Sequence, residues 1–213
     1  MILAFDTSGG HVAAALLDRN RVSLRCEAMA RGQAERLMPL LEELLAEVGA
    51  QWADITRLGV GVGPGNFTGI RISVSAARGL ALGLDIPAVG VSSLEALAFG
   101  ASCPVTTLVQ APRDQLYMQR FDGGAATDAP SLIPMDQIGD LCPGGTVFVG
   151  ARAEDCASRC DGQSQTATFP LAEAIARVAA ARDDTTSRPA PLYLKPADAA
   201  PSRDAPPTIL DDA

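Results

Sequence analysis

The sequence predicts an α/β fold in two halves, residues 1–101 and 102–213, in which strands alternate with helices. In the first half, three strand-like segments precede helix, strand, helix, strand and helix, an order typical of a layered α/β domain. After Cys103-Pro104 the alternation begins again. A chain of 213 residues, 47% of them hydrophobic, is long enough to bury the cores that this organisation needs.

The chain opens with alternating or continuous apolar runs that predict strands at 2–6, 11–18 and 21–28. Gly9-Gly10 between the first two runs is suited to a tight hairpin turn. We therefore expect an antiparallel meander at the N-terminus.

The next segment, AERLMPLLEELLAEVG at 34–49, carries leucines at helical spacing and predicts an amphipathic helix. Gly49 is a suitable residue for its end. Because a proline inside a helix removes one backbone hydrogen bond, Pro39 predicts that the helix begins near Leu37 or kinks there.

The stretch GVGPGNFTGIRISVSAARGLALG, 61–83, joins a strand at 57–65 to a helix at 66–84. Its glycines fit neither G-x-x-x-x-G-K-[ST] nor G-x-G-x-x-G, so its loop is not a standard phosphate loop. Asn66 or Thr68 can cap the helix. Glycines inside a helix cost about 1 kcal/mol each relative to alanine, so we expect another element to approach this helix closely.

A short buried strand at 86–91 and a helix at 92–100, opened by a capping box from Ser92 to Glu95, complete the first half. In the second half we expect strands at 105–110 and 115–121, a loop at 123–131, a helix at 135–142, a strand at 146–150 and a helix at 170–182. The tail from about residue 188 is a candidate to pack back on the first half and lacks periodicity beyond that.

The composition restricts the function. A formal charge of −8 disfavours stand-alone binding of nucleic acid. The start of the chain has no basic, apolar leader pattern and no stretch is apolar enough to span a membrane, so we expect a cytoplasmic protein. The five cysteines are interpreted as reduced thiols.

His11 is the single histidine, which excludes any site that needs two imidazoles. Its place after Gly9-Gly10 favours a solvated turn residue. Asp6, Thr7 and Ser8 end the first strand, where they either form a turn or could hold a hydrated Mg²⁺ and a phosphate.

Several of these segments together resemble the TsaB (YeaZ) family: ILAFDTS, AERLMPLLEELL, GVGPGNFTGIR with the small residues after it, and VGVSSLEALA. PLYLKPADAAPSRDAPP resembles the C-terminal segment of that family. The resemblance covers most of residues 1–100 and is sparse between residues 120 and 185.

The resemblance implies an α/β fold of the actin/Hsp70-like type (ASKHA), two RNase H-like halves with mixed sheets flanked by helices. It implies a non-catalytic subunit that supports TsaD, which transfers a threonylcarbamoyl group to position 37 of ANN-decoding tRNAs. TsaE is a further partner, TsaC an indirect one, and the isolated family member forms homodimers. No cofactor is expected for this chain alone, whether ATP or ADP binds at the complex interface is left open, and Asp6, Thr7 and Ser8 become candidates for a vestigial nucleotide-binding segment.

TsaD-type proteins carry a metal-binding H-x-x-x-H, and Ser93 and Leu97 stand where its two histidines would lie. Neither side chain binds a divalent metal as imidazole does, so no metal ligands and no catalytic residues are expected. Two alternatives remain open: a stand-alone ATP-using kinase of the same fold and an M22-like peptidase. The chain departs from the family at Gln33, often histidine in relatives, and at 110–117, where an Asp and a Glu are lost.

On this interpretation the helices at 34–49 and 66–84 meet the equivalent helices of TsaD or of a second copy. Arg71 is expected to contribute little, as a charge at the rim. The expected partner surface comprises Gln33, Arg36, Leu37, Leu41, Leu44, Gly63, Pro64, Gly65, Asn66, Phe67, Thr68, Gly69, Arg71, Ile72, Ser75, Ala76 and Gly79.

Overall fold

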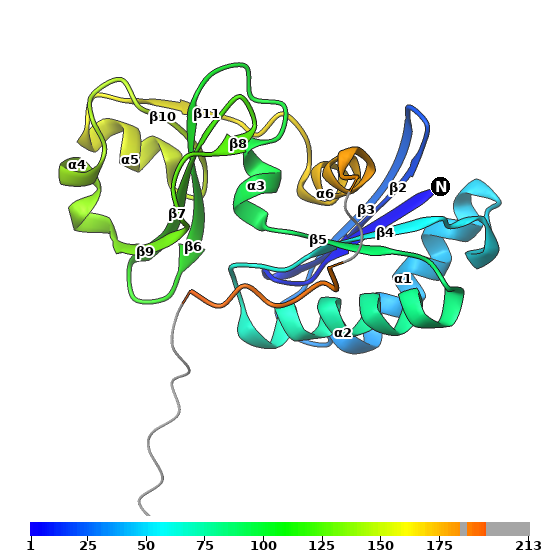
Figure 1. Ribbon diagram of the computed structural model, residues 1–213. Helices are drawn as coiled ribbons and strands as arrows, with labels where there is room; N and C mark the ends of the chain where they lie inside the picture. Colours follow the sequence, from blue (N-terminus) through cyan, green and yellow to red (C-terminus); the bar gives the residue numbers. More distant parts are fainter. Residues whose placement is uncertain (184–186, 195–213) are drawn as a thin grey trace, which may run out of the picture.

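Figure 1 shows the computed structural model of the chain, which describes residues 1–183 and 187–194, as two sheets that each carry helices. The first sheet has the strand order β3-β2-β1-β4-β5. Strands β1, β2 and β3 pair antiparallel, whereas β4 is parallel to β1 and β5 to β4. Its strands are β1 (Ile2–Asp6), β2 (His11–Asp18), β3 (Arg21–Ala28), β4 (Arg57–Gly61) and β5 (Ala88–Val91). The N-terminal meander therefore has the expected bounds.

Helices cover both faces of this sheet (Figure 1). Successive strand residues point to opposite faces, so Leu3 and Phe5 pack under α1 (Gln33–Val48) and α2 (Phe67–Leu84). Ala4 lies on the other face, under α6 (Leu171–Ala181). The short 3₁₀ helix η1 (Trp52–Asp54) joins α1 to β4.

The placement of α6 differs from the division at residue 101, which assigned residues 102–213 to the second half. Although α6 follows both sheets in the sequence, its alanines pack on β1, β2 and β4 of the first sheet. The Arg57 guanidinium secures its end, donating to the carbonyls of Ala179 at 2.7 Å and Arg182 at 3.0 Å. Periodicity identifies a helix but not the sheet that it covers.

The second sheet has the order β11-β10-β6-β7-β8, with β9 also paired to β7. Strands β6 and β7 are antiparallel, while β10 is parallel to β6 and β11 to β10. Phe148 is fully buried in one of its two cores. The strands are β6 (Val105–Ala111), β7 (Gln115–Asp122), β8 (Ala125–Ala126), β9 (Ser131–Pro134), β10 (Val147–Gly150) and β11 (Gln163–Gln165). The helices are α3 (Ser93–Ala98), η2 (Met135–Gln137), α4 (Ile138–Leu141) and α5 (Ala153–Arg159).

Three local expectations need correction. Helix α1 begins at Gln33 and not near Leu37, and it contains Pro39 because its buried leucines offset the lost hydrogen bond; a kink there stays a prediction. Only half of the capping box forms: Ser92 Oγ accepts from the Glu95 amide at 3.0 Å, while the Glu95 carboxylate pairs with Arg182. The expected loop at 123–131 includes the short strand β8.

The described part of the tail, residues 187–194, runs along α2. Arg78 Nε donates to the Pro189 carbonyl at 2.7 Å, and the Leu192 amide donates to the Val62 carbonyl at 2.8 Å. The expected irregular stretch from residue 195 lies outside the described residues. None of the helices in residues 1–183 combines the length and hydropathy of a membrane span.

Candidate functional site

The carboxyl end of β1 is a buried polar cluster. Asp6 and Thr7 are fully buried and Ser8 is 4% exposed. One carboxylate oxygen of Asp6, Oδ2, accepts from the Ser8 amide at 3.0 Å, from Ser8 Oγ at 3.0 Å and from His11 Nε2 at 2.8 Å. The chain's own polar groups thus occupy one side of this carboxylate.

His11 is not the solvated turn residue that its position suggested. It begins β2, and its side chain is 25% exposed because the ring turns inward onto Asp6. The hydrogen bond with Asp6 raises the pKa of His11 above its ordinary value, against the lowering effect of burial. The ring also covers Gly9, where a β-carbon would lie 2.6 Å from its Cε1.

The other oxygen of Asp6, Oδ1, is buried without a hydrogen-bond partner among the described residues. It packs directly on Gly61 at the end of β4, where a β-carbon would collide with it. This role of Gly61 was not predicted from the sequence. Its position two residues before the GPGN loop was the available indication.

The glycine-rich loop is fastened onto this cluster. The Asn66 amide donates to the Ser8 carbonyl at 2.7 Å, and Thr7 Oγ1 donates to the Gly69 carbonyl at 2.6 Å. A β-carbon at Gly65 or Gly69 would collide with the backbone carbonyl of Ser8 or Thr7. The loop therefore needs its glycines in order to lie against β1, and a phosphate could reach Asp6–Ser8 only after the loop had moved.

The loop also sets the start of α2. Asn66 is the N-cap, and its Oδ1 accepts from the amides of Thr68 at 2.9 Å and Gly69 at 3.2 Å. Gly63 takes a left-handed backbone with φ of +90°, and its carbonyl accepts from the Ser93 amide at 2.8 Å. Gly63 and Pro64 are both buried, so they act within the chain and present no surface.

Several residues expected to touch a partner are instead interior. Leu37, Leu41 and Leu44 are at most 2% exposed and belong to the core between α1, α2 and the first sheet. Gln33 is 7% exposed, and its Nε2 donates to the carbonyls of Gly9 at 2.8 Å and His11 at 2.9 Å. The amphipathic face that identified α1 is the face that the chain itself buries.

Arg36 remains partly exposed on α1 but is already paired. Its guanidinium binds Glu27 of β3, with Nε donating at 2.7 Å, and Glu43 of α1, with Nη1 donating at 2.6 Å. These contacts tie α1 to the edge strand of the sheet.

The outer face of α2 is left partly uncovered by residues 1–183 and 187–194. Ile72 and Ala76 are half-buried because they also pack against the core of the first sheet, whereas Ser75 and Gly79 are exposed. Leu82, which the sequence analysis did not single out, is 86% exposed. We call the set Ile72, Ser75, Ala76, Gly79, Leu82 and Gly83 the outer face of α2.

Two glycines, Gly79 and Gly83, leave this face of the helix without protruding side chains at their positions. A β-carbon added at Gly79 or Gly83 would meet nothing within 4 Å among the described residues. Their spacing of four places them on one side of the helix, as in small-xxx-small pairs that let two helix backbones approach closely. The close approach expected from the sequence is therefore not made within the described chain.

An aromatic group with one arginine adjoins the outer face. The rings of Phe67 and Tyr193 stack with centroids 4.6 Å apart and planes at 31°. The Arg71 guanidinium lies 3.9 Å from the Phe67 centroid, and its Nε donates to the Tyr193 hydroxyl at 3.0 Å. We call Phe67, Arg71 and Tyr193 the aromatic cluster.

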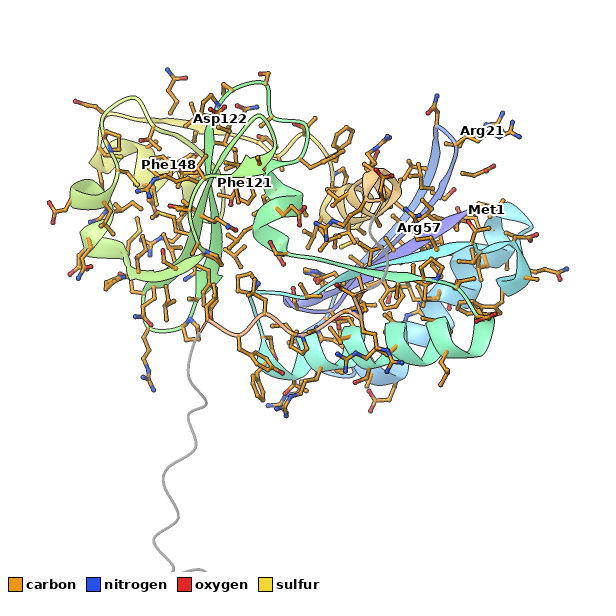
Figure 2. The ribbon with its side chains drawn as sticks, viewed as in Figure 1. Met1, Arg21, Arg57, Phe121, Asp122 and Phe148 are labelled. Carbon is orange, nitrogen blue, oxygen red and sulfur yellow. The ribbon has the colours of Figure 1, made fainter. Side chains whose placement is uncertain are left out.

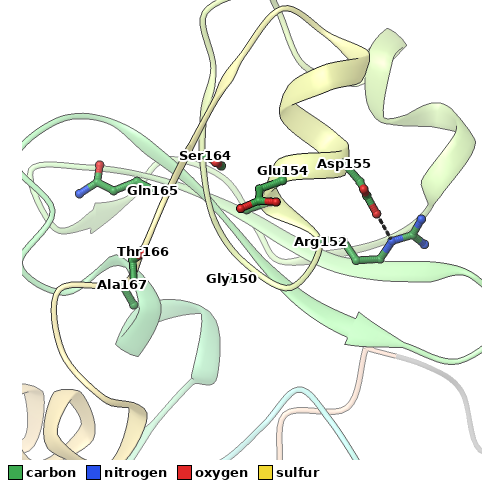
Figure 3. Close-up of a pocket in the computed structure, with 9 residues that line it drawn as sticks. Gly150, Arg152, Glu154, Asp155, Ser164, Gln165, Thr166 and Ala167 are labelled. Carbon is green, nitrogen blue, oxygen red and sulfur yellow. Dashed lines mark hydrogen bonds and ion pairs between the residues drawn. The ribbon is translucent and has the colours of Figure 1, made fainter.

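The second half contains a polar cavity of about 470 Å³ between the start of α5 on one side and β11 with the two residues after it on the other (Figure 3). Its one arginine, Arg152, is already neutralised, because Nε donates to Asp155 at 2.9 Å and Nη1 pairs with Asp114. Glu154 adds a further negative charge to the lining. The cavity thus offers no unpaired cation for an anionic ligand.

The five cysteines are free. Cys142 and Cys156 lie in a core of the second half, where burial raises the pKa of the Cys156 thiol to about 11. This thiol stays protonated near neutral pH, and thiols are poor nucleophiles in that form.

Comparison with known proteins shows which family the chain resembles. Residues 26–148 match the family described as TsaD, tRNA N6-adenosine threonylcarbamoyltransferase. The tRNA threonylcarbamoyladenosine biosynthesis protein TsaB of Escherichia coli is 40% identical over 100 residues, 47% of this chain and 43% of that protein. The solved structure of YeaZ from Pseudomonas aeruginosa superposes with a TM-score of 0.73 at 26% identity, covering 91% of this chain and 99% of that one.

The chain belongs to the TsaB (YeaZ) family. The expected actin/Hsp70-like fold, with two mixed sheets flanked by helices, is confirmed. An uncharacterized protein of Mycobacterium tuberculosis, Rv3421c, is 30% identical over 94% of both chains. The matched region spans less than half of the TsaB proteins of E. coli and Haemophilus influenzae, 43% and 42% of their lengths.

Proposed function

We propose that this chain is a non-catalytic scaffold or activator subunit of the tRNA N6-threonylcarbamoyladenosine transferase and that it binds TsaD. The outer face of α2 carries the proposal, because Gly79 and Gly83 leave room that no described residue fills. The pathway is supported by the matched transferase family and by the TsaB relatives, which are tRNA threonylcarbamoyladenosine biosynthesis proteins. The target is then position 37 of ANN-decoding tRNAs.

The non-catalytic role is supported by the residues at the metal positions of TsaD-type proteins. Ser93 is 4% exposed beneath the glycine-rich loop, and Leu97 packs against a core of the second half. A serine and a leucine cannot take the place of two imidazole ligands.

The proposed partner surface is narrower than the sequence implied. It consists of the cap and first turn of α2, Arg71 and the outer face, with α1 contributing its partly exposed Arg36. Two such helices would meet the equivalent pair of TsaD, or of a second copy when the chain is alone. A stable contact of this kind buries on the order of 1,200 Å² or more in total. The α2 residues are Asn66, Phe67, Thr68, Arg71, Ile72, Ser75, Ala76, Gly79, Leu82 and Gly83.

The proposal assigns the remaining parts of the reaction to other chains. TsaE joins the complex, TsaC supplies the threonylcarbamoyl donor indirectly, and ATP or ADP binds at the boundary with TsaD and not to this chain alone. The formal charge of −8 supports weak tRNA binding by the isolated chain, with TsaD supplying the basic surface. All of these steps belong in the cytoplasm.

A bulky residue on the outer face tests the proposal. Ala76→Trp should block close approach, reduce TsaD binding in calorimetry and lower threonylcarbamoyladenosine in tRNA hydrolysates, while the monomer stays folded. Ala180→Trp is the matched control, because Ala180 is exposed at the end of α6 on the opposite face of the sheet. Unchanged TsaD affinity and unchanged modification in Ala76→Trp would place the interface elsewhere.

A further inference from the structure

The aromatic cluster holds the Arg71 guanidinium in one orientation. The Phe67 ring supports its face at 3.9 Å, and the Tyr193 hydroxyl accepts from Nε at 3.0 Å. Both rings are 42% exposed, so the cluster is open to solvent and to a partner. Since a stacked arginine loses less side-chain freedom on binding, this arrangement prepares the side chain to bind.

Within the part of the chain that the structure describes, the two Nη groups of Arg71 make no hydrogen bond or ion pair. Among residues 1–183 and 187–194, no carboxylate lies within ion-pair distance of Arg71, whereas Arg36, Arg120, Arg152 and Arg182 each have at least one. With Nε engaged by Tyr193, the two Nη groups form a planar pair of donors that matches the two oxygens of a carboxylate.

The tail fixes the cluster in place. The tail is held by two hydrogen bonds, one between Leu192 and Val62 and one between Pro189 and Arg78. These bonds bring Tyr193 beside the first turn of α2. Arg71 and Ser75 are four residues apart on the helix, so the cluster is continuous with the outer face.

We propose that the aromatic cluster is a receptor for one carboxylate side chain of the partner protein, in which Arg71 binds both oxygens and Phe67 and Tyr193 orient it. The inference rests on the proposed function, because it names a contact within the same partner surface. A single carboxylate fits better than an RNA backbone, since the site offers one cation on a chain of charge −8 and phosphate chains are held through several. The cluster thereby gives Arg71 a larger role than that of a rim charge.

Three variants of the full chain test this, each measured by calorimetry against TsaD. Arg71→Lys keeps the charge but loses the planar donor pair, and should weaken binding about 10- to 100-fold. Tyr193→Phe keeps the ring and removes the hydroxyl, and should weaken it about 3- to 10-fold. Arg21→Lys is the control, because Arg21 lies at the tip of the β2–β3 hairpin, away from α2 (Figure 2), and should bind as the parent does.

The outcomes separate this inference from the proposed function. If Ala76→Trp abolishes TsaD binding while Arg71→Lys binds as the parent does, the receptor is refuted and the partner surface stands. If neither variant changes binding, both fall. If Arg71→Lys lowers tRNA affinity in fluorescence anisotropy and leaves TsaD affinity unchanged, the cluster binds RNA phosphate and the inference is overturned.

Discussion

The two ends of α2 use glycine for opposite reasons. Near its start, Gly69 faces β1, and a β-carbon there would collide with the Thr7 carbonyl. Toward its end, Gly79 and Gly83 face outward, and a β-carbon would meet nothing within 4 Å among the described residues. The first glycine is explained by the chain's own packing, whereas the other two are not.

The difference separates a glycine that the fold requires from two that the described fold does not explain. A glycine in a helix interior costs about 1 kcal/mol relative to alanine. At Gly69 the close fit of the loop against β1 offsets that cost. At Gly79 and Gly83 no described contact does, and this unexplained cost is the reason for proposing that a partner binds there.

The largest effect is expected at the start of the helix. Gly69→Ala should lower the free energy of unfolding by about 2–3 kcal/mol, because the added methyl group meets a backbone carbonyl that cannot move without disturbing the loop. Urea denaturation of the purified chain measures this. Parent-like stability would mean that the loop is not fastened to β1 as described.

The second-largest loss of stability is expected in the polar cluster of Asp6, Ser8 and His11 beneath the loop. Asp6→Ala removes the acceptor shared by Ser8 and His11 and should cost about 1–3 kcal/mol in unfolding free energy. Asp122→Ala is the control, since Asp122 is an exposed residue at the end of β7 (Figure 2). A cost no greater than that of the control would rule out a structural role for Asp6.

The same cluster predicts a pH dependence. Because Asp6 raises the pKa of His11 above 6.5, the pair's contribution is fully present below pH 6.5 and is lost as pH rises through the folded-state pKa. Asp6 is the charged group that acts on His11. The urea midpoint of the parent should therefore fall above pH 6.5 by an amount that His11→Gln removes, and identical pH profiles for both proteins would count against the pair.

The smallest effect has the opposite sign. Gly79→Ala should stabilise the isolated chain by up to about 1 kcal/mol, since alanine is the better helix former and the methyl group has room. The same variant should bind TsaD more weakly, because it raises the outer face. Loss of stability would show that Gly79 is needed within the chain after all.

The sequence predicted local structure better than it predicted what each element packs against. The bounds of β1, β2 and β3 follow from the hydrophobic pattern and the turn residues. The Asn66 cap follows from the ability of an asparagine side chain to accept hydrogen bonds from backbone amides two and three residues later. The sheet under α6 and the burial of Leu37, Leu41 and Leu44 depend on long-range packing, which helical periodicity does not report. It marks the buried face without saying whether the chain or a partner buries it.

The candidate site shows the same limit. The Asp6–His11 contact needs the register of the β1–β2 hairpin, and Tyr193 reaches Arg71 only because a tail 122 residues away in sequence runs along α2. Gly79 and Gly83 were recognisable from the sequence as a thin helix side. That nothing in the described chain fills the space beside them required the structure.

The central claim is that the outer face of α2 binds TsaD, and site-specific photo-cross-linking tests it most directly. A photoreactive phenylalanine analogue at Leu82, which is 86% exposed, should capture TsaD in the assembled complex. The same analogue at Leu141, a 41% exposed leucine of the second half, should not. Capture of TsaD from position 141 and not from position 82 would contradict the account.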